Sequence, residues 1–252
     1  MNRYLVNLEK IEFVVTNACT GNCKHCSQGD HPITSERIDP TAAAELVRSV
    51  AENYDIKTVM TFGGEPLLHT DAVYAIHTAA KNMGVKHRQL ITNGYFSKDV
   101  AVIENIAKTI ADCGVNDLLL SVDAFHQETI PIDTVRLFAA YAVKFGIPVR
   151  LQPAWLVSRD DNNPYNLKTR EILASLSDVV SAVSDGNVIF PEGNALRYLS
   201  EYFDGITPEN PYIEDSKDVR CISIDSDGRL FGGNIYETDV LTLLEGYTPE
   251  AD

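Results

Sequence analysis

Three cysteines near the start of the chain are the residues best suited to chemistry. Cys19, Cys23 and Cys26 follow the spacing CxxxCxxC. Cysteine thiolates are the usual protein ligands of iron–sulfur clusters, and three of them hold three irons of a [4Fe–4S] cluster. The fourth iron then has no protein ligand, and an open coordination position is typical of a catalytic metal site. The spacing therefore indicates a cluster at which chemistry takes place.

Zinc is the competing interpretation of these cysteines. A structural zinc ion usually needs four Cys or His ligands, and His25 is the nearest candidate for the fourth. Neighbouring residues of so tight a loop rarely complete one tetrahedron, and no second CxxC or HxxxH pair occurs in the chain. The other cysteines, Cys113 and Cys221, are isolated. A zinc-stabilised scaffold or a simple iron–sulfur electron carrier therefore remains as a non-catalytic alternative.

A second motif follows downstream. Gly63, Gly64 and Glu65 come directly after an apolar run that begins at Thr58. A CxxxCxxC loop after one predicted strand, with Gly-Gly-Glu after the next, resembles the radical SAM superfamily. Glycines permit close backbone approach, and a carboxylate pairs with a cation. A plain strand-to-helix turn is the alternative for the Gly-Gly pair taken alone.

The resemblance implies two cofactors, a [4Fe–4S] cluster and S-adenosylmethionine (SAM). Cys19, Cys23 and Cys26 would be the cluster ligands. Gly63, Gly64 and Glu65 match the segment that receives the methionine ammonium group of SAM. In this family, one-electron reduction cleaves the sulfonium bond of SAM, and the resulting 5′-deoxyadenosyl radical abstracts hydrogen from a substrate.

Four further residues are expected to bind SAM. Ser121 and Asp123 resemble the position that contacts the ribose and carboxylate groups, and Asn93 fits the same wall of the site. Arg150 shares one face of its strand with Gln152 and could clamp the methionine carboxylate. Three of them have a structural alternative: Asp123 as a turn cap, Asn93 as a turn residue, Arg150 as a solvated side chain at a strand start.

A looser match follows further along. The segment 189–195, which contains Gly193, partly resembles the segment of the family that lines the adenine.

The elements that must position these residues alternate along the chain. We expect strands at 11–15, 58–62, 87–92, 117–122, 149–156 and 188–190. We expect helices at 40–53, 71–83, 100–113, 133–145, 167–180 and 194–203. Such alternation argues for βα units around a parallel sheet. The motifs follow the carboxyl ends of strands, where α/β barrels carry their active sites. The predicted fold is α/β, a partial (β/α)6 barrel that is open on one side.

Two helices have recognisable starts. Asp39 is a candidate N-cap before Pro40, and Asn166 is a candidate cap of the helix at 167–180.

The C-terminal part breaks the repeat. We expect a barrel domain at 1–206 and an appendage at 207–252, with a β-hairpin from Cys221 to Tyr236 that turns at Asp227-Gly228. This hairpin resembles the auxiliary-cluster region of peptide-modifying members of the family. No cysteine follows Cys221, so we expect no auxiliary cluster and interpret Cys221 as a buried structural thiol.

The composition and charge narrow the class of protein to which the chain can belong. The chain has 252 residues and a net charge of −15, which argues against nucleic acid as the main partner because phosphates are bound by Lys and Arg. No apolar stretch approaches the roughly 18 residues of a membrane span, and no signal peptide is visible. The clustered cysteines do not resemble a disulfide framework.

These observations lead to one prediction of function. We expect a cytoplasmic, oxygen-sensitive radical SAM enzyme that acts on a peptide or protein side chain or on a small metabolite. It would need a low-potential electron donor such as flavodoxin or ferredoxin.

Overall fold

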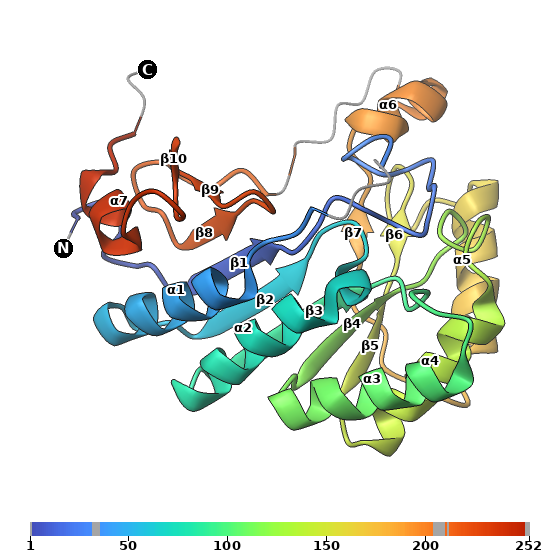
Figure 1. Ribbon diagram of the computed structural model, residues 1–252. Coiled ribbons are helices and arrows are strands. Elements are labelled where there is room, and N and C mark those ends of the chain that lie inside the picture. Colours follow the sequence, from blue (N-terminus) through green and yellow to red (C-terminus); the bar gives the residue numbers. More distant parts are fainter. Residues whose placement is uncertain (1, 32–35, 204–209, 211, 250–252) are drawn as a thin grey trace.

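A six-stranded parallel sheet lies at the centre of the computed structural model, which describes residues 2–31, 36–203, 210 and 212–249 (Figure 1). The strands are β1 (Lys10–Val14), β2 (Thr58–Phe62), β3 (His87–Thr92), β4 (Asp117–Ser121), β5 (Val149–Gln152) and β8 (Cys221–Ile224). Their spatial order is β5-β4-β3-β2-β1-β8, and all neighbours are parallel. Since β5 and β8 lie at opposite ends of this order, the sheet is open, which confirms the predicted α/β partial barrel.

Four long helices cover one face of the sheet (Figure 1). They are α1 (Pro40–Asn53), α2 (Thr70–Asn82), α3 (Val100–Cys113) and α4 (Ile132–Lys144). The predicted start of the first helix is confirmed, because the Asp39 side chain accepts a hydrogen bond from the backbone N–H of Ala42 at 2.8 Å. Gly114 ends α3 in the left-handed conformation, with φ 99°, that favours glycine.

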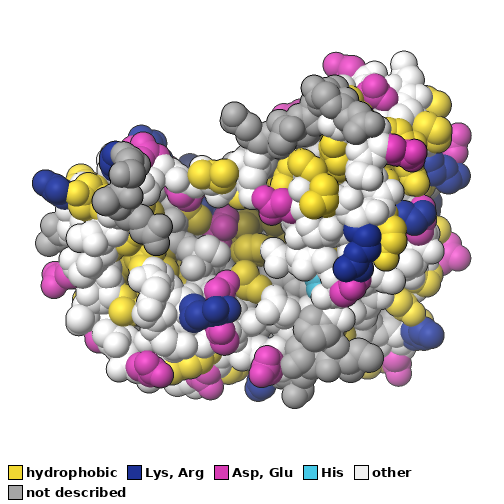
Figure 2. Space-filling model, turned by 90° about the horizontal axis from the view of Figure 1, so that it is seen from above, with side chains coloured by type: hydrophobic (Ala, Val, Ile, Leu, Met, Phe, Trp, Pro, Cys, Tyr) yellow, Lys and Arg dark blue, Asp and Glu magenta, His cyan; other side chains and the backbone are white. Residues whose placement is uncertain are grey.

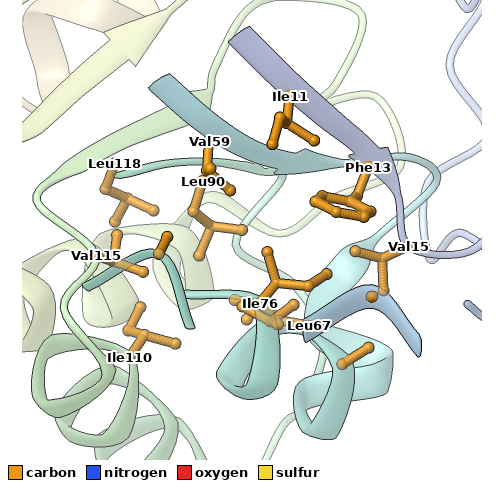
Figure 3. Packing of buried hydrophobic residues seen from close by; sticks show 14 of the residues in the cluster. Ile11, Phe13, Val15, Val59, Leu67, Ile76, Leu90, Ile110, Val115 and Leu118 are labelled. Carbon is orange, nitrogen blue, oxygen red and sulfur yellow. The ribbon is translucent and has the colours of Figure 1, made fainter. Parts of the chain in front are cut away.

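The main core lies between these helices and the sheet (Figure 3). Every second residue of a strand points into it. One such residue from each of four neighbouring strands is labelled in Figure 3: Ile11, Val59, Leu90 and Leu118. They meet Ile76 of α2 and Ile110 of α3, and all six side chains are buried. Because side chains alternate across a strand, the residues between them face the other side of the sheet.

The predicted fifth strand, 149–156, is split at Pro153. A proline has no N–H to donate to a sheet, and after it the chain leaves β5 to form β6 (Ala154–Trp155). β6 pairs with β7 (Asn187–Val188) in a separate two-stranded sheet, where the Pro153 carbonyl accepts from the N–H of Asn187 at 3.0 Å. The predicted sixth strand at 188–190 is therefore not part of the main sheet.

The sixth position of the main sheet is taken by β8, from the C-terminal part. It lies beside β1, with Cys221 opposite Lys10. A tight turn follows, in which the N–H of Gly228 donates to the Asp225 carbonyl at 2.9 Å. The antiparallel pair β9 (Arg229–Leu230) and β10 (Gly233–Asn234) comes next.

The predicted hairpin is thus present in a shorter form. The chain reverses at Asp227-Gly228, as predicted, where the N–H of Asp225 donates to the Arg229 carbonyl at 3.1 Å. It reverses again at Phe231-Gly232, between β9 and β10, where φ is 51° and 77°. The chain continues into α7 (Val240–Gly246). The predicted domain boundary at residue 206 falls outside the described residues.

Four further helical elements complete the described fold: a 3-10 turn at Pro66–His69, α5 (Pro164–Ser175), α6 (Gly193–Tyr198) and a 3-10 turn at Ser200–Tyr202. The prediction of Asn166 as a cap was wrong. Asn163 caps α5 by accepting from the N–H of Asn166 at 2.9 Å. Asn166 is instead buried and donates to the Leu156 and Ser158 carbonyls. Among the helices with described residues, none combines the length and apolarity that crossing a membrane requires.

Leu118 provides a test of the core. We expect Leu118→Ala to lower the free energy of unfolding by about 2–5 kcal/mol, because the fully buried side chain leaves a cavity. Leu167, which is 48% exposed on α5, is the matched control, and Leu167→Ala should cost under about 1 kcal/mol. Urea denaturation of both variants measures the difference, and equal losses would contradict the assigned core.

Candidate active site

The cysteine loop, residues 15–31, follows β1 at the carboxyl edge of the sheet. Segments that follow other strands surround it: 63–65 after β2, 92–94 after β3, 121–127 at the end of β4, and 192–194 after β7. These segments are far apart in sequence, and parallel strands bring their carboxyl ends to one edge. The predicted motifs therefore meet in one place.

The Gly-Gly pair is held against the backbone of the cysteine loop. The N–H of Gly64 donates to the Thr16 carbonyl and that of Glu65 to the Ala18 carbonyl, both at 2.8 Å. A Cβ atom at Gly64 would lie 2.1 Å from the Ala18 carbonyl oxygen. Gly63 has φ 139°, and its Cβ would lie 2.5 Å from the Thr16 oxygen. Only glycine permits this approach. The predicted contact of both glycines with SAM stays a prediction.

Glu65 connects the ends of β2 and β3. Its buried carboxyl group accepts from the N–H of Leu67 at 3.0 Å, the hydroxyl of Thr92 at 2.7 Å and the N–H of Asn93 at 2.8 Å. Burial raises the pKa of Glu65 to about 7, although the three hydrogen bonds act in the opposite direction. The side chain thus has a connecting role here, and its predicted pairing with the ammonium group stays a prediction.

Asn93 lies beside the first cysteine, as the sequence predicted for the wall of the site. Its Nδ2 is 3.6 Å from Cys19 Sγ and 3.1 Å from Thr20 Oγ1. Its Oδ1 accepts from the N–H of Tyr95 at 2.8 Å, which is also the turn role given as the alternative. The residue therefore fixes a turn and contacts the cysteine loop.

The three thiols differ in their electrostatic surroundings. Burial raises the pKa of Cys19 to about 11, and burial together with the nearby Asp123 carboxylate raises that of Cys23 further above its usual value. Burial also acts upward on Cys26, but the hydrogen bond and charge of His31 outweigh it, so the pKa of Cys26 lies below its usual value. Metal ligation requires thiolates, so loading this site must release protons.

His31 links the two ends of the cysteine loop. Its Nε2 is 3.3 Å from Cys26 Sγ, and its Nδ1 is 2.8 Å from the Asn17 carbonyl oxygen. A carbonyl only accepts hydrogen bonds, so Nδ1 carries a proton. Sequence analysis missed His31. Its place in the same loop, five residues after Cys26, was the available signal.

Asn194 at the start of α6 clamps the cysteine loop. Its backbone N–H donates to the Cys26 carbonyl at 2.9 Å, and its Nδ2 donates to the carbonyls of Gly29 at 3.2 Å and Cys23 at 3.4 Å. A Cβ at Gly193 would lie 2.4 Å from the Ser27 carbonyl oxygen. Sequence analysis linked this segment loosely to the adenine and missed Asn194. A single Asn beside a glycine has no local signature for such long-range contacts.

Asp123 is buried and surrounded by donors. One carboxylate oxygen accepts from the N–H groups of Phe125 and His126, both at 2.9 Å, and the other from His126 Nδ1 at 2.7 Å and the N–H of Ala154 at 3.1 Å. Burial acts to raise the pKa of Asp123, but the nearby His126 and His25 and these hydrogen bonds outweigh it and hold the pKa below its usual range. This arrangement favours the capping alternative over the predicted ribose contact.

The structure separates Arg150 from the other predicted residues. Its guanidinium pairs with both carboxylate oxygens of Asp117, at 3.0 and 2.6 Å. Asp117 is the first residue of β4, so this pair lies toward the amino ends of the strands, away from the cysteine loop. Ser121, the last residue of β4, lies in register with Gln152 at the carboxyl edge. The predicted carboxylate clamp by Arg150 is therefore not supported, and Ser121 stays a candidate.

Unpaired polar atoms gather around the cysteine loop. Four buried side-chain atoms among the described residues lack a hydrogen-bond partner, and three of them belong to this region: His25 Nδ1, Gln127 Nε2 and Asn194 Oδ1. The fourth belongs to His77, in the core. Buried polar atoms are normally paired, so this concentration suits a bound polar ligand. Three thiols with such neighbours fit an iron–sulfur cluster with an organic cofactor beside it.

Comparisons with known proteins identify the family of the chain. The sequence model of the radical SAM superfamily matches residues 13–147. A probable GTP 3′,8-cyclase of Saccharolobus islandicus is 27% identical over 227 residues, which cover 82% of this chain and 68% of the relative. A probable GTP 3′,8-cyclase of Methanocaldococcus jannaschii is 26% identical over 121 residues, 48% of this chain and 38% of the relative.

Two solved structures share the fold. SuiB of Streptococcus suis bound to S-adenosylmethionine aligns with a TM-score of 0.65 at 13% identity, over 96% of this chain and 67% of SuiB. HydG, a maturase of the [FeFe]-hydrogenase, aligns with a TM-score of 0.53 at 15% identity, over 85% of this chain and 48% of HydG. At these identities the likeness concerns the fold alone.

Glu65 predicts a pH dependence of stability. Its pKa of about 7 in the folded chain exceeds the usual 4.5, so the folded state binds the proton more tightly. The free energy of unfolding therefore falls as pH rises from about 4.5 to about 7, by on the order of 2 kcal/mol from this group. Glu65→Gln should flatten this decline in urea denaturation of the metal-free protein. The exposed Glu45 is the control, and Glu45→Gln should keep the wild-type slope. Parallel curves for all three proteins would contradict the assignment.

Asn194 predicts an effect on metal loading. Asn194→Ala removes the side-chain bonds to the cysteine loop, and losing such outer partners lowers metal affinity by about 10- to 100-fold. We expect less iron and sulfide bound after anaerobic reconstitution and faster loss to a chelator. Asn82→Ala, at the exposed end of α2, should load like the wild type. Equal retention in both variants would show that the clamp is not needed.

Proposed function

The chain belongs to the radical SAM superfamily, and we propose from this that it removes a hydrogen atom from an organic substrate, with a peptide or protein side chain as the first candidate. Enzymes of this class use a [4Fe–4S] cluster and S-adenosylmethionine. The observation that carries the proposal is the cysteine loop itself. Cys19, Cys23 and Cys26 lie at the carboxyl edge of the sheet, with unpaired buried polar atoms around them.

Each residue of the candidate site has its own proposed role. Cys19, Cys23 and Cys26 would hold the cluster, which when bound supplies the electron that cleaves the sulfonium bond of SAM to a 5′-deoxyadenosyl radical. Gly63 and Gly64 bring the β2 end against the cysteine loop, and Asn194 holds the loop from the opposite side. Asn93 and Ser121 are the proposed contacts for SAM.

Two observations support a peptide or protein substrate. The β9–β10 hairpin corresponds to the region that resembles peptide-modifying members. SuiB has also been solved with its precursor peptide SuiA, and that structure aligns over 96% of this chain with a TM-score of 0.60. A small metabolite is the second candidate, because the sequence relatives are named as GTP 3′,8-cyclases.

The remaining partner is a reductant. We propose a low-potential one-electron donor, such as a flavodoxin or ferredoxin. The Gly-Gly-Glu segment argues against the two non-catalytic alternatives. Neither a zinc scaffold nor a simple electron carrier accounts for it, whereas membership of the family does.

Formation of 5′-deoxyadenosine tests the proposed function. The protein is reconstituted anaerobically with iron and sulfide and given SAM and a strong reductant. We expect slow 5′-deoxyadenosine production, which falls to background in Cys23→Ala because one cluster ligand is lost. Cys113→Ala, a change outside the cysteine loop, should retain the wild-type rate. Absence of product from a wild-type protein with a verified cluster and an added pool of candidate peptides would overturn the proposal.

A further inference from the structure

The face of the sheet opposite the helices carries an apolar row, defined as Val14, Phe62, Ile91 and Leu119. The four residues come from four neighbouring strands, β1 to β4. Val14 is in register with Phe62, and Ile91 with Leu119. On each of these strands a residue or segment of the site follows within two residues: the cysteine loop, Gly63, Asn93 and Ser121. The apolar row therefore lies directly below the candidate site.

Burial separates this row from the main core. Leu119 is 8% exposed yet joins neither core cluster, whereas its neighbours Leu118 and Leu120 lie in the main core. Val14, Phe62 and Ile91 are half-buried and do not pack against that core. Seen from above, the molecule is hollowed in its middle, and hydrophobic side chains lie at the bottom of the hollow (Figure 2). The partial exposure of Val14, Phe62 and Ile91 shows that the row is not fully covered by the rest of the described chain.

The charged side chains of this face are paired, both Lys10 further down and Arg150, which is in register with Leu119 at the end of the row. Lys10 forms an ion pair with Glu12. Arg150 pairs with Asp117 at 2.6 Å, and Asp117 also accepts from the Gln89 side-chain amide at 2.7 Å. The Glu12 and Asp117 side chains are only 18% and 17% exposed. Lys10 and Arg150 are therefore each engaged by a largely buried carboxylate of the same sheet.

This arrangement has a consequence for the charge of a ligand. A nucleoside triphosphate is held by lysine and arginine side chains that form charge-assisted hydrogen bonds to its phosphates. Lys10 and Arg150 have partners, and the residues outside the described ranges include no lysine or arginine. Apolar surface, in contrast, gains free energy when it is covered by hydrocarbon, at roughly 25 cal/mol per Å². The face thus complements an uncharged group.

From this we infer that the apolar row binds an uncharged aliphatic or aromatic side chain of a peptide substrate, and not a phosphorylated nucleotide. The inference rests on the proposed function for the place of the reacting bond, just above the row. Substrate specificity would then be set by Val14, Phe62, Ile91 and Leu119. Charged peptide side chains would be disfavoured because burying a charge without a partner is costly.

Saturation-transfer NMR on the reconstituted, SAM-bound protein tests the inference. The probes are N-acetyl-leucinamide, N-acetyl-phenylalaninamide, N-acetyl-lysinamide and GTP with magnesium. We expect transfer to the two apolar amides at least severalfold stronger than to the lysine amide or GTP. GTP that binds as strongly as the apolar amides, or displaces them, would overturn the inference, and this comparison needs no variant.

Matched variants locate the binding surface. Val14→Thr replaces a methyl group by a hydroxyl of nearly the same shape, and Ile91→Thr shortens the side chain by one carbon and adds a hydroxyl. Both make the row more polar, so transfer to the apolar amides should fall severalfold. Val143→Thr with Val102→Thr changes exposed valines on α4 and α3 and should leave transfer unchanged. Equal effects of both pairs, with folding checked by circular dichroism, would overturn the inference.

Different results would overturn the proposed function and the proposed binding of an uncharged side chain. Production of 5′-deoxyadenosine without selective amide binding would overturn only the substrate class. Selective binding without 5′-deoxyadenosine, even with candidate peptides added, would overturn the proposed function and keep the assignment of the apolar surface.

Discussion

The contact between the backbone of the cysteine loop and the two glycine-containing segments is the constraint on which the site depends. Gly64 meets the loop at its start, and Gly193 meets it near Cys26. Neither position has room for a Cβ atom, so backbone atoms contact the loop closely on both sides. A rigid backbone frame lets three cysteines converge without a side-chain scaffold of their own. It also explains why residues of such small size lie beside the cysteines.

Buried carboxylates act as connectors around this frame. Glu65 joins the β2 and β3 ends, and Asp123 joins the β4 end to His126 and to the start of β6. Each accepts hydrogen bonds from several donors, and this satisfies polar groups that burial would otherwise penalise. A carboxylate in a family motif can therefore shape a site without touching its ligand. Residue type and spacing alone do not distinguish the two roles.

Local sequence patterns predicted the parts of the structure that short-range interactions determine. The first four strands, the α1 cap at Asp39 and the meeting of the cysteine and Gly-Gly-Glu motifs all follow from periodicity, turn residues and the rule that parallel strands share an edge. The pairing of β8 with β1 was not predicted. The sequence of Cys221–Ile224 resembles half of a hairpin, and its pairing with β1 is long-range. The pairing of Arg150 with Asp117 was not predicted, because alternation predicts which face a side chain occupies but not which partner on that face it finds. Asn194 and His31 act through single long-range or loop contacts that no local pattern encodes.

The place of β8 has a consequence for how the protein comes to exist. The strand that leads into the cysteine loop, β1, is made before β8, one of the two strands that flank it in the sheet. Until β8 is made, β1 has an unpaired edge, and closing so long a loop makes this pairing a late event. The central sheet, and with it the frame around the cysteine loop, is therefore complete only after β8 has been translated.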